Sequence, residues 1–188
     1  MKVREILALA RGCPTRLWLT CFGAYALSQM DLALWSYALP VIRVEFDMSR
    51  TGIGVLTGAA FGLGGVALVW LGMLADRIGR KKTMIGGIVA ASVFVAAHGL
   101  AMNPVALGAL RAASMASGGL LYPATGALVA EEAPAKIRGL MTGLLQVAYP
   151  LGWFLASMLA VLVLADHGWR VLFIAGLIGL PFALVVKR

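Results

Sequence analysis

Charged side chains are scarce in this sequence, and acidic ones are the scarcest. Of 188 residues, 13% are Asp, Glu, Lys or Arg and 61% are apolar, whereas a soluble domain carries about a quarter charged residues. Eight acidic and 16 basic residues give a net charge of +8. Because the basic residues fall in short gaps between long apolar runs, we interpret them as determinants of membrane orientation and expect no nucleic-acid partner. The composition predicts an integral protein of the lipid bilayer.

Motifs for metal, nucleotide or covalent chemistry are also missing. The two cysteines, Cys13 and Cys21, provide no disulfide framework, and no cysteine–histidine spacing typical of a metal site is present. The stretch Gly62-Leu63-Gly64 lacks the third glycine of a dinucleotide-binding loop and lies in an apolar run. We therefore expect no metal, no cofactor and no enzymatic activity.

Six apolar runs approach the length of about 20 residues that a membrane-spanning helix needs. They are residues 17–41, 53–74, 84–101, 105–130, 140–164 and 169–186. Twelve Lys and Arg residues fall in the N-terminal segment 1–16, in the second and fourth gaps and in the tail 187–188, whereas three fall on the other side. Positive charge marks the cytoplasmic side, so the pattern predicts an all-α membrane protein, a six-helix transmembrane bundle with both termini cytoplasmic, and we expect it in a bacterial inner membrane.

Two opposite charges interrupt these runs, Asp31 in the first and Arg111 in the fourth. An ionised side chain at bilayer depth costs about 3 kcal/mol, so it is retained mainly where it faces a bundle interior or a water-filled path. At about 1.5 Å per residue, Asp31 lies roughly 15 Å from Val41 and Arg111 roughly 9 Å from Val105. We expect the two side chains to face one water-filled cavity, where they can pair directly or through water, and a static ion pair between two helices is the alternative.

Other polar and aromatic side chains near the middle of the runs are candidates for a substrate path. They are Gln29, Trp35, Ser36, Tyr122 and Gln146. Gln29 and Ser36 are seven residues apart and therefore share a helix face. For each residue taken singly, packing or helix–helix hydrogen bonding is an equally good explanation. His98 lies near the end of the third run, which predicts a place at the membrane interface, with a role in a proton relay as the alternative.

The second gap carries the most specific motif of the chain. It reads Gly72-Met73-Leu74-Ala75-Asp76-Arg77-Ile78-Gly79-Arg80-Lys81-Lys82. This stretch closely resembles the signature loop between the second and third helices of the major facilitator superfamily. The matching positions are Gly72, Leu74, Asp76, Arg77, Gly79, Arg80 and Lys81. Asp76, Glu131 and Arg138 also bring charges of both signs to one membrane face, where they predict a latch that breaks when helices separate. Anchoring by the basic residues is the alternative.

The resemblance extends along the whole chain. Asp31 followed nine residues later by Pro40 resembles the first-helix motif of proton-coupled members, and Arg111 resembles the fourth-helix arginine motif. Residues 131–139 and 168–173 resemble the family's fourth-to-fifth connection and its entrance to the sixth helix. The implied fold is an amino-terminal six-helix half made of two inverted three-helix repeats, in which the first and fourth helices line the cavity.

The resemblance also implies roles for these residues. In a secondary transporter Asp31 would carry the proton and Arg111 would bind an anionic substrate, because its planar fork suits a carboxylate. Proline and glycine at Pro150 and Gly152 predict a hinge in the fifth helix. That helix lacks the glycine–proline pair of family drug antiporters, and the chain looks more like organic-acid and sialate proton symporters. This implies proton-coupled uptake of a small organic anion by alternating access.

Family members have about twelve helices in two halves, whereas this sequence stops where their central cytoplasmic loop would begin, with residues 187–188 as its start. We expect the partner to be a missing C-terminal six-helix half or a second copy in a homodimer. Two alternatives stay open at this stage. One is a half-size or truncated membrane scaffold that does not transport, and the other is a proton antiporter for drugs or metabolites.

Overall fold

The computed structural model of the chain describes residues 15–187 and is built from helices. The α-helices are α2 (Thr15–Glu45), α3 (Arg50–Ile78), α4 (Arg80–Ala97), α5 (Pro104–Gly119), α6 (Leu121–Glu132), α7 (Arg138–Leu145), α8 (Ala148–Ile174) and α9 (Gly179–Lys187). Two short 3-10 helices, η1 (His98–Leu100) and η2 (Ala175–Ile178), follow α4 and α8. No strand occurs in residues 15–187, so the predicted all-α class is confirmed. The predicted N-terminal segment lies almost wholly outside the described residues.

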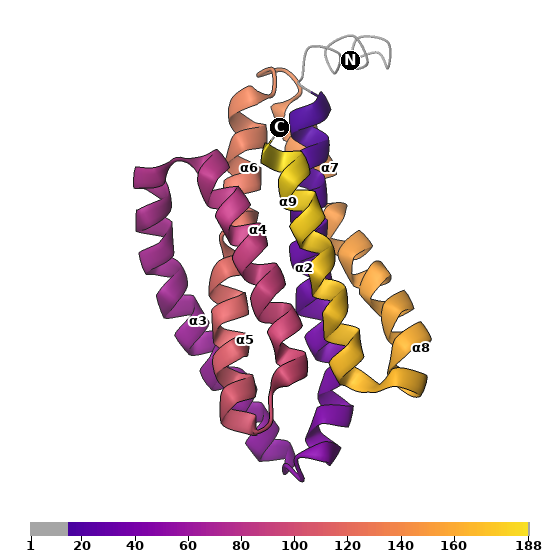
Figure 1. Cartoon of the computed structure of the whole chain (residues 1–188). Coiled ribbons are helices and arrows are strands. Elements are labelled where there is room, and N and C mark those ends of the chain that lie inside the picture. The colour runs from indigo at the N-terminus through magenta and orange to yellow at the C-terminus, as the bar shows by residue number, and fades with distance from the viewer. Residues whose placement is uncertain (1–14, 188) are drawn as a thin grey trace.

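Four stretches of the described chain are long and apolar enough to cross a membrane, residues 50–78, 80–100, 104–132 and 138–187. The last stretch is interrupted at Gly168, where φ of 76° and ψ of 173° end the helix and reverse the chain (Figure 1). Helix α2 is 31 residues long and carries polar side chains in its middle. The six predicted spans fall on the observed helices and on the short breaks between them. The count of six membrane crossings and the inverted repeats stay predictions.

The turns between helices follow local sequence signals. The Ser49 hydroxyl accepts a hydrogen bond of 2.9 Å from the Gly52 N–H and caps α3, and the Asn103 side chain accepts one of 2.8 Å from the Ala106 N–H and caps α5. Such caps satisfy backbone donors that the first helical turn leaves free. Between α3 and α4, Gly79 has φ of +95°, a conformation that glycine adopts without steric cost. The motif glycine is therefore the turn residue.

Two helix breaks stand three residues ahead of a proline. Leu120 separates α5 from α6 ahead of Pro123, and Gln146 and Val147 separate α7 from α8 ahead of Pro150. Proline lacks a backbone N–H and its ring crowds the preceding turn. Each break is therefore the structural consequence of the proline that follows it.

Helix α2 runs through the middle of the bundle, with α8 packed along one side of it and the paired α3 and α5 beyond its other side (Figure 1). Buried apolar side chains form two clusters. One includes Cys21, Met84 and Leu145, and the other includes Leu34 and Phe173. Buried apolar surface of this kind fixes the four helices that surround the site described below.

The two ends of the bundle differ in charge. Helix α2 begins and α9 ends at the same end, where the α3–α4 turn and the α6–α7 loop also lie (Figure 1). We call this the basic end, because Arg80, Lys81 and Arg138 lie there. Glu45 and Gly168 lie at the opposite end. The orientation of these ends relative to a membrane stays a prediction.

Candidate functional site

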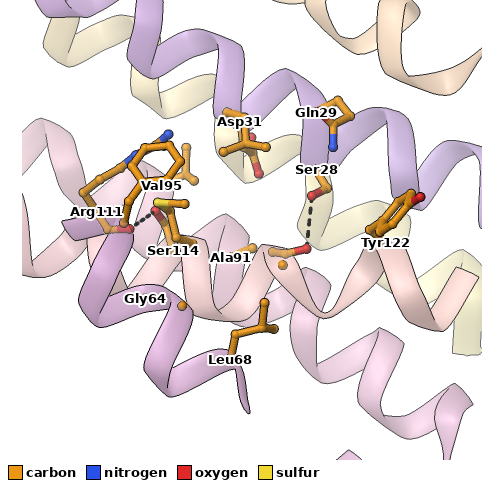
Figure 2. A pocket seen from close by; sticks show the side chains of 16 residues that line it. Ser28, Gln29, Asp31, Gly64, Leu68, Ala91, Val95, Arg111, Ser114 and Tyr122 are labelled. Carbon is orange, nitrogen blue, oxygen red and sulfur yellow. Dashed lines mark hydrogen bonds between the residues drawn. The ribbon is translucent and has the colours of Figure 1, made fainter. Parts of the chain in front are cut away.

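A cavity of about 320 Å³ lies between α2, α3, α4 and α5. Its polar lining includes Gln29 and Asp31 from α2 and Arg111 and Ser114 from α5, and Tyr122 from α6 closes one side. Figure 2 shows these side chains converging on the same space. The cavity therefore brings together the two intramembrane charges that the sequence singled out.

Asp31 is partly buried and faces this cavity. It also lines a much smaller cavity of about 10 Å³ next to Ile88 and Gly176. One turn away, the Ser28 hydroxyl donates a hydrogen bond of 3.1 Å to the Gly118 carbonyl and ties α2 to α5 (Figure 2). This bond holds the cavity-facing turn of α2 against the helix that carries the arginine.

Arg111 is 2% exposed. The guanidinium carbon lies 4.9 Å from the centroid of the Trp35 ring and 5.7 Å from that of Phe61. Both distances are within the range of cation–π attraction, which strengthens when the cation is desolvated. Arg111 Nε is buried without a hydrogen-bond partner. The guanidinium is thus held by aromatic faces and keeps hydrogen-bonding capacity free.

The two charges do not touch. Among residues 15–187 the structure records two ion pairs, Arg80–Glu131 and Arg170–Glu45, so Asp31 and Arg111 share the cavity without direct pairing. Neither the direct pairing expected from the sequence nor the static ion pair is therefore observed, while pairing through water stays a prediction. Space between opposite charges leaves room for a ligand or a proton donor.

Small residues make the close helix approach at the cavity possible. A Cβ on Gly64 would lie 2.9 Å from the Ala112 carbonyl oxygen, and one on Gly119 would lie 3.0 Å from Leu68 Cδ2. Any side chain at these positions would push α3 away from α5 or fill the cavity. Close packing on small residues is the usual way in which membrane helices associate.

Of the other predicted substrate residues, Gln29 and Tyr122 line the cavity, and Trp35 lies beneath the guanidinium. Ser36 is exposed and lies outside the cavity lining. Gln146 is exposed as well, and its Oε1 accepts a 3.3 Å hydrogen bond from the Tyr25 hydroxyl. The Tyr25 ring lies 5.3 Å from the Tyr122 ring, centroid to centroid, so Gln146 reaches the cavity wall only through two tyrosines.

Three polar or aromatic side chains that line the cavity, Ser28, Phe61 and Ser114, were not predicted from the sequence. Ser28 and Ser114 are each one helical turn from a predicted charge, and Ser114 donates a 2.9 Å hydrogen bond to the Arg111 carbonyl. Helical spacing of three residues was the available signal for both serines. Phe61 had no such signal, because an aromatic residue in an apolar run looks the same whether it faces lipid or a cation.

At the basic end, Arg80 Nη1 lies 2.6 Å from Glu131 Oε1 and joins the start of α4 to α6. Both side chains are about half exposed. Gly72 and Asp76 of α3 and Arg80 of α4 line a crevice of about 250 Å³ that α6 also borders. The remaining basic residues of the predicted gate, Arg77, Lys81 and Arg138, are exposed. The ion pair supplies one physical component of the predicted latch, whose function stays a prediction.

The predicted hinge residues have different surroundings. Pro150 is exposed next to the α7–α8 break. Gly152 is buried against α2, where a Cβ would lie 2.4 Å from the Ala26 carbonyl oxygen and 2.7 Å from Gln29 Cβ. Close packing alone therefore accounts for the glycine. A hinge at Pro150 stays a prediction.

The opposite end carries a cluster that the sequence did not reveal. The Glu45 carboxylate accepts hydrogen bonds from Trp169 Nε1 and Arg170 Nη1, and the Arg170 guanidinium lies 4.4 Å from the centroid of the Trp169 ring. The bond from Trp169, followed by that from Arg170, lowers the pKa of Glu45, which lies outside the predicted span 17–41. This clasp fastens the end of α2 to the turn after Gly168.

The interfacial prediction for His98 is wrong. The side chain is 0% exposed and is packed against two rings, with centroids 5.7 Å from Trp35 and 4.8 Å from Phe173. Position near the end of an apolar run suggested a solvated side chain. The packing of α4 between α2 and the end of α8 instead encloses it.

The chain is similar in sequence to one family of membrane transport proteins. The model of the family described as Major Facilitator Superfamily matches residues 21–187. The cis,cis-muconate transport protein of Acinetobacter baylyi is 34% identical over 171 residues, which cover 90% of this chain and 41% of that protein. The gentisate transporter of Corynebacterium glutamicum is 31% identical over 164 residues, covering 83% of this chain and 37% of that protein.

The fold has solved counterparts. The crystal structure of a D-xylose–proton symporter matches this chain with a TM-score of 0.80 at 19% identity, covering 93% of this chain and 48% of that one. At this identity the likeness concerns the fold alone. The chain spans about two fifths of the length of the curated relatives named above.

Proposed function

The chain belongs to the major facilitator superfamily, and we propose that it forms one helical bundle of a secondary transporter that takes up small organic anions together with protons by alternating access. It is an integral, multi-pass membrane protein. The observation that supports the proposal most strongly is the cavity in which Asp31 and Arg111, from two different helices, lie without pairing.

Arg111 is the proposed anchor for the substrate carboxylate. A guanidinium offers parallel N–H donors that match the two oxygens of a carboxylate. The relatives are named for cis,cis-muconate and gentisate, and we propose an unsaturated or aromatic carboxylate as the substrate class here. The cavity volume is near the lower limit of about 300–1,000 Å³ for ligand pockets, which suits a small solute. Phe61 and Tyr122 supply aromatic surface for the rest of such a molecule.

Asp31 is the proposed proton carrier. An anion that engages Arg111 changes the charge that Asp31 faces across the cavity, and proton affinity depends on neighbouring charge. Substrate binding and protonation are thereby linked within one space. The bundle also shares its fold with a D-xylose–proton symporter, so this architecture is compatible with proton coupling.

The second wall of the pathway is proposed to come from another helical bundle. Gly54, Gly58 and Gly62 of α3 have open space where a Cβ would stand, and glycine at every fourth position lets another helix approach closely. We propose that a second six-helix half, or a second copy of this chain, covers this face. The basic end is proposed to be cytoplasmic in a bacterial inner membrane, with the Arg80–Glu131 pair as part of a latch that opens during transport.

Uptake measurements test the proposal. Cells that produce the chain from its own gene receive radiolabelled cis,cis-muconate or gentisate under an imposed proton gradient. Accumulation is expected with the wild-type chain and not with Asp31→Asn, while Arg111→Lys should raise KM about tenfold, the factor given by 1.4 kcal/mol of lost charged hydrogen bonding. Ser157→Ala is the matched control, because this hydroxyl bonds only to the Phe154 carbonyl of its own helix.

Each outcome of that experiment is decisive. Gradient-driven accumulation by Asp31→Asn at the wild-type level would remove the carrier role. A wild-type chain that accumulates neither solute would favour the membrane scaffold that the sequence left open. Accumulation that falls when the gradient is imposed would indicate antiport.

A further inference from the structure

Four buried rings connect Arg111 with the clasp at the opposite end. The Trp35 ring lies 4.9 Å from the guanidinium carbon of Arg111 and 5.7 Å, centroid to centroid, from His98. His98 stacks on Phe173 at 4.8 Å, and Phe173 meets Trp169 at 6.0 Å. The three ring separations are typical of interacting aromatic pairs, and the Trp35–Arg111 distance is typical of a cation–π contact. We call Trp35, His98, Phe173 and Trp169 the aromatic column.

The column is dry and continuous. Each of its four side chains is at most 2% exposed, and they come from α2, η1 and α8. At one end Trp35 contacts the cavity cation, and at the other Trp169 Nε1 donates to Glu45. A close-packed interior transmits displacement, because its side chains have little room to move independently.

Within the column, His98 is anchored by its ring nitrogen to backbone carbonyls of its own segment. Its Nδ1 lies 2.7 Å from the Phe94 carbonyl oxygen and 3.1 Å from that of Val95. Carbonyl oxygens only accept, so Nδ1 carries the proton and donates, which fixes the plane of the ring. Its Nε2 is buried without a partner, an unfavourable arrangement that an apolar ring would avoid. A histidine that only filled space would be a poor choice here.

We propose that His98 is a positioning residue for Arg111. Its backbone-anchored ring holds the edge-on Trp35 ring in place, and Trp35 in turn presents the face on which the guanidinium rests. Without the anchored imidazole, the indole shifts and Arg111 loses its fixed place at the cavity. The placement of Arg111 is independent of the transport activity, and only its effect on substrate affinity rests on the proposed function.

The reactivity of Arg111 towards phenylglyoxal, followed by mass spectrometry on the full chain in native membranes, tests this directly. The reagent modifies accessible guanidinium groups. In His98→Ala the modification of Arg111 should rise about fivefold, as expected for a weakened cation–π contact, while exposed Arg50 serves as the reference within each sample. His98→Phe keeps a ring but loses the Nδ1 anchor, and it should produce a smaller rise of about twofold.

Met84→Ala is the matched control. Met84 is 1% exposed and lies on α4, the helix that leads into η1 and His98, but it belongs to the other apolar cluster. Its truncation therefore loosens packing away from the column. Unchanged Arg111 modification in His98→Ala would overturn the proposal, and so would an equal rise in Met84→Ala. If the His98→Ala protein is not found in the membrane, the His98→Phe variant is used instead. Arg111 reactivity equal to that of the wild type in His98→Phe would then contradict the proposal.

A second readout separates positioning from general damage. In uptake assays His98→Ala should raise the KM for the carboxylate substrate about fivefold, in line with the loosened Arg111, and leave the maximal rate per folded molecule unchanged. A lower maximal rate with an unaltered KM would contradict positioning. If the wild-type chain moves no substrate, the proposed function fails, while the phenylglyoxal result still decides the inference on His98.

Discussion

Alanine at Gly152 tests how closely α8 must pack on α2 beside the cavity. A Cβ there would lie 2.4 Å from the Ala26 carbonyl oxygen, 2.7 Å from Gln29 Cβ and 2.8 Å from the Met30 nitrogen. Real Cβ contacts essentially never fall below 3.0 Å, so these atoms must separate by at least 0.6 Å at the closest contact. Two of the three neighbours are backbone atoms, which cannot rotate away as a side chain can.

The cost follows from this geometry. Overpacking a tight interior destabilises by about 1–3 kcal/mol, and a backbone neighbour places Gly152→Ala at the upper limit. The matched control is Gly143→Ala in α7, where no atom lies within 4 Å of the added Cβ. Alanine there should be neutral or stabilise by up to about 1 kcal/mol, because it is the better helix former.

Thermal unfolding of the chain in detergent, followed by near-ultraviolet circular dichroism, measures both variants. In chains of 150–250 residues each kcal/mol shifts the midpoint by about 2–4 °C, so Gly152→Ala should unfold about 6–12 °C below the wild type. Gly143→Ala should unfold at or above the wild-type midpoint. Equal midpoints for Gly152→Ala and the wild type would refute the close approach of the two helices.

Three further variants probe the two ends of the bundle. Gly79→Ala forces a side chain into a backbone with φ of +95° and should lower stability by about 1–3 kcal/mol in the same unfolding assay. Glu131→Gln breaks the half-exposed pair with Arg80 and should lower the free energy of unfolding by less than about 1 kcal/mol. If the pair is part of a latch, uptake should nevertheless fall strongly, and normal uptake would exclude the latch. The lowered pKa of Glu45 means that its stabilising effect is complete above the ordinary glutamate pKa of about 4.3 and is lost as pH falls through the lowered value. The wild-type midpoint should therefore drop in acid, whereas Glu45→Gln should start lower at neutral pH and lack this component of the drop.

The sequence predicted most of the helical framework because its signals are local. Apolar runs, the turn at Gly79 and the prolines that follow the breaks before α6 and α8 each act within a few residues. Asp31 and Arg111 were found because an ionised group in an apolar run is costly unless it faces a polar space. Both side chains line one cavity because the helices that carry them, α2 and α5, pack next to each other.

Other parts of the site could not be predicted, because the roles of those residues depend on their position along the helix axis and on contacts with residues far away in the sequence. Spacing of seven residues puts Gln29 and Ser36 on one helix face, but Ser36 lies about 10 Å further along the axis and misses the cavity. His98 was predicted at the interface and Phe61 was not singled out, because the contacts with Trp35 and Arg111 come from α2 and α5. Such contacts join residues more than 45 positions apart in the sequence, and no local pattern encodes them.

The central claim is that one cavity joins Asp31 and Arg111 in moving a proton with an organic anion. The most direct test records external pH in a lightly buffered suspension of cells that produce the chain, after a pulse of unlabelled cis,cis-muconate. We expect alkalinisation of the medium with the wild-type chain and none with Asp31→Asn at equal abundance in the membrane. Alkalinisation by Asp31→Asn at the wild-type rate, or wild-type uptake without any proton movement, would contradict the claim.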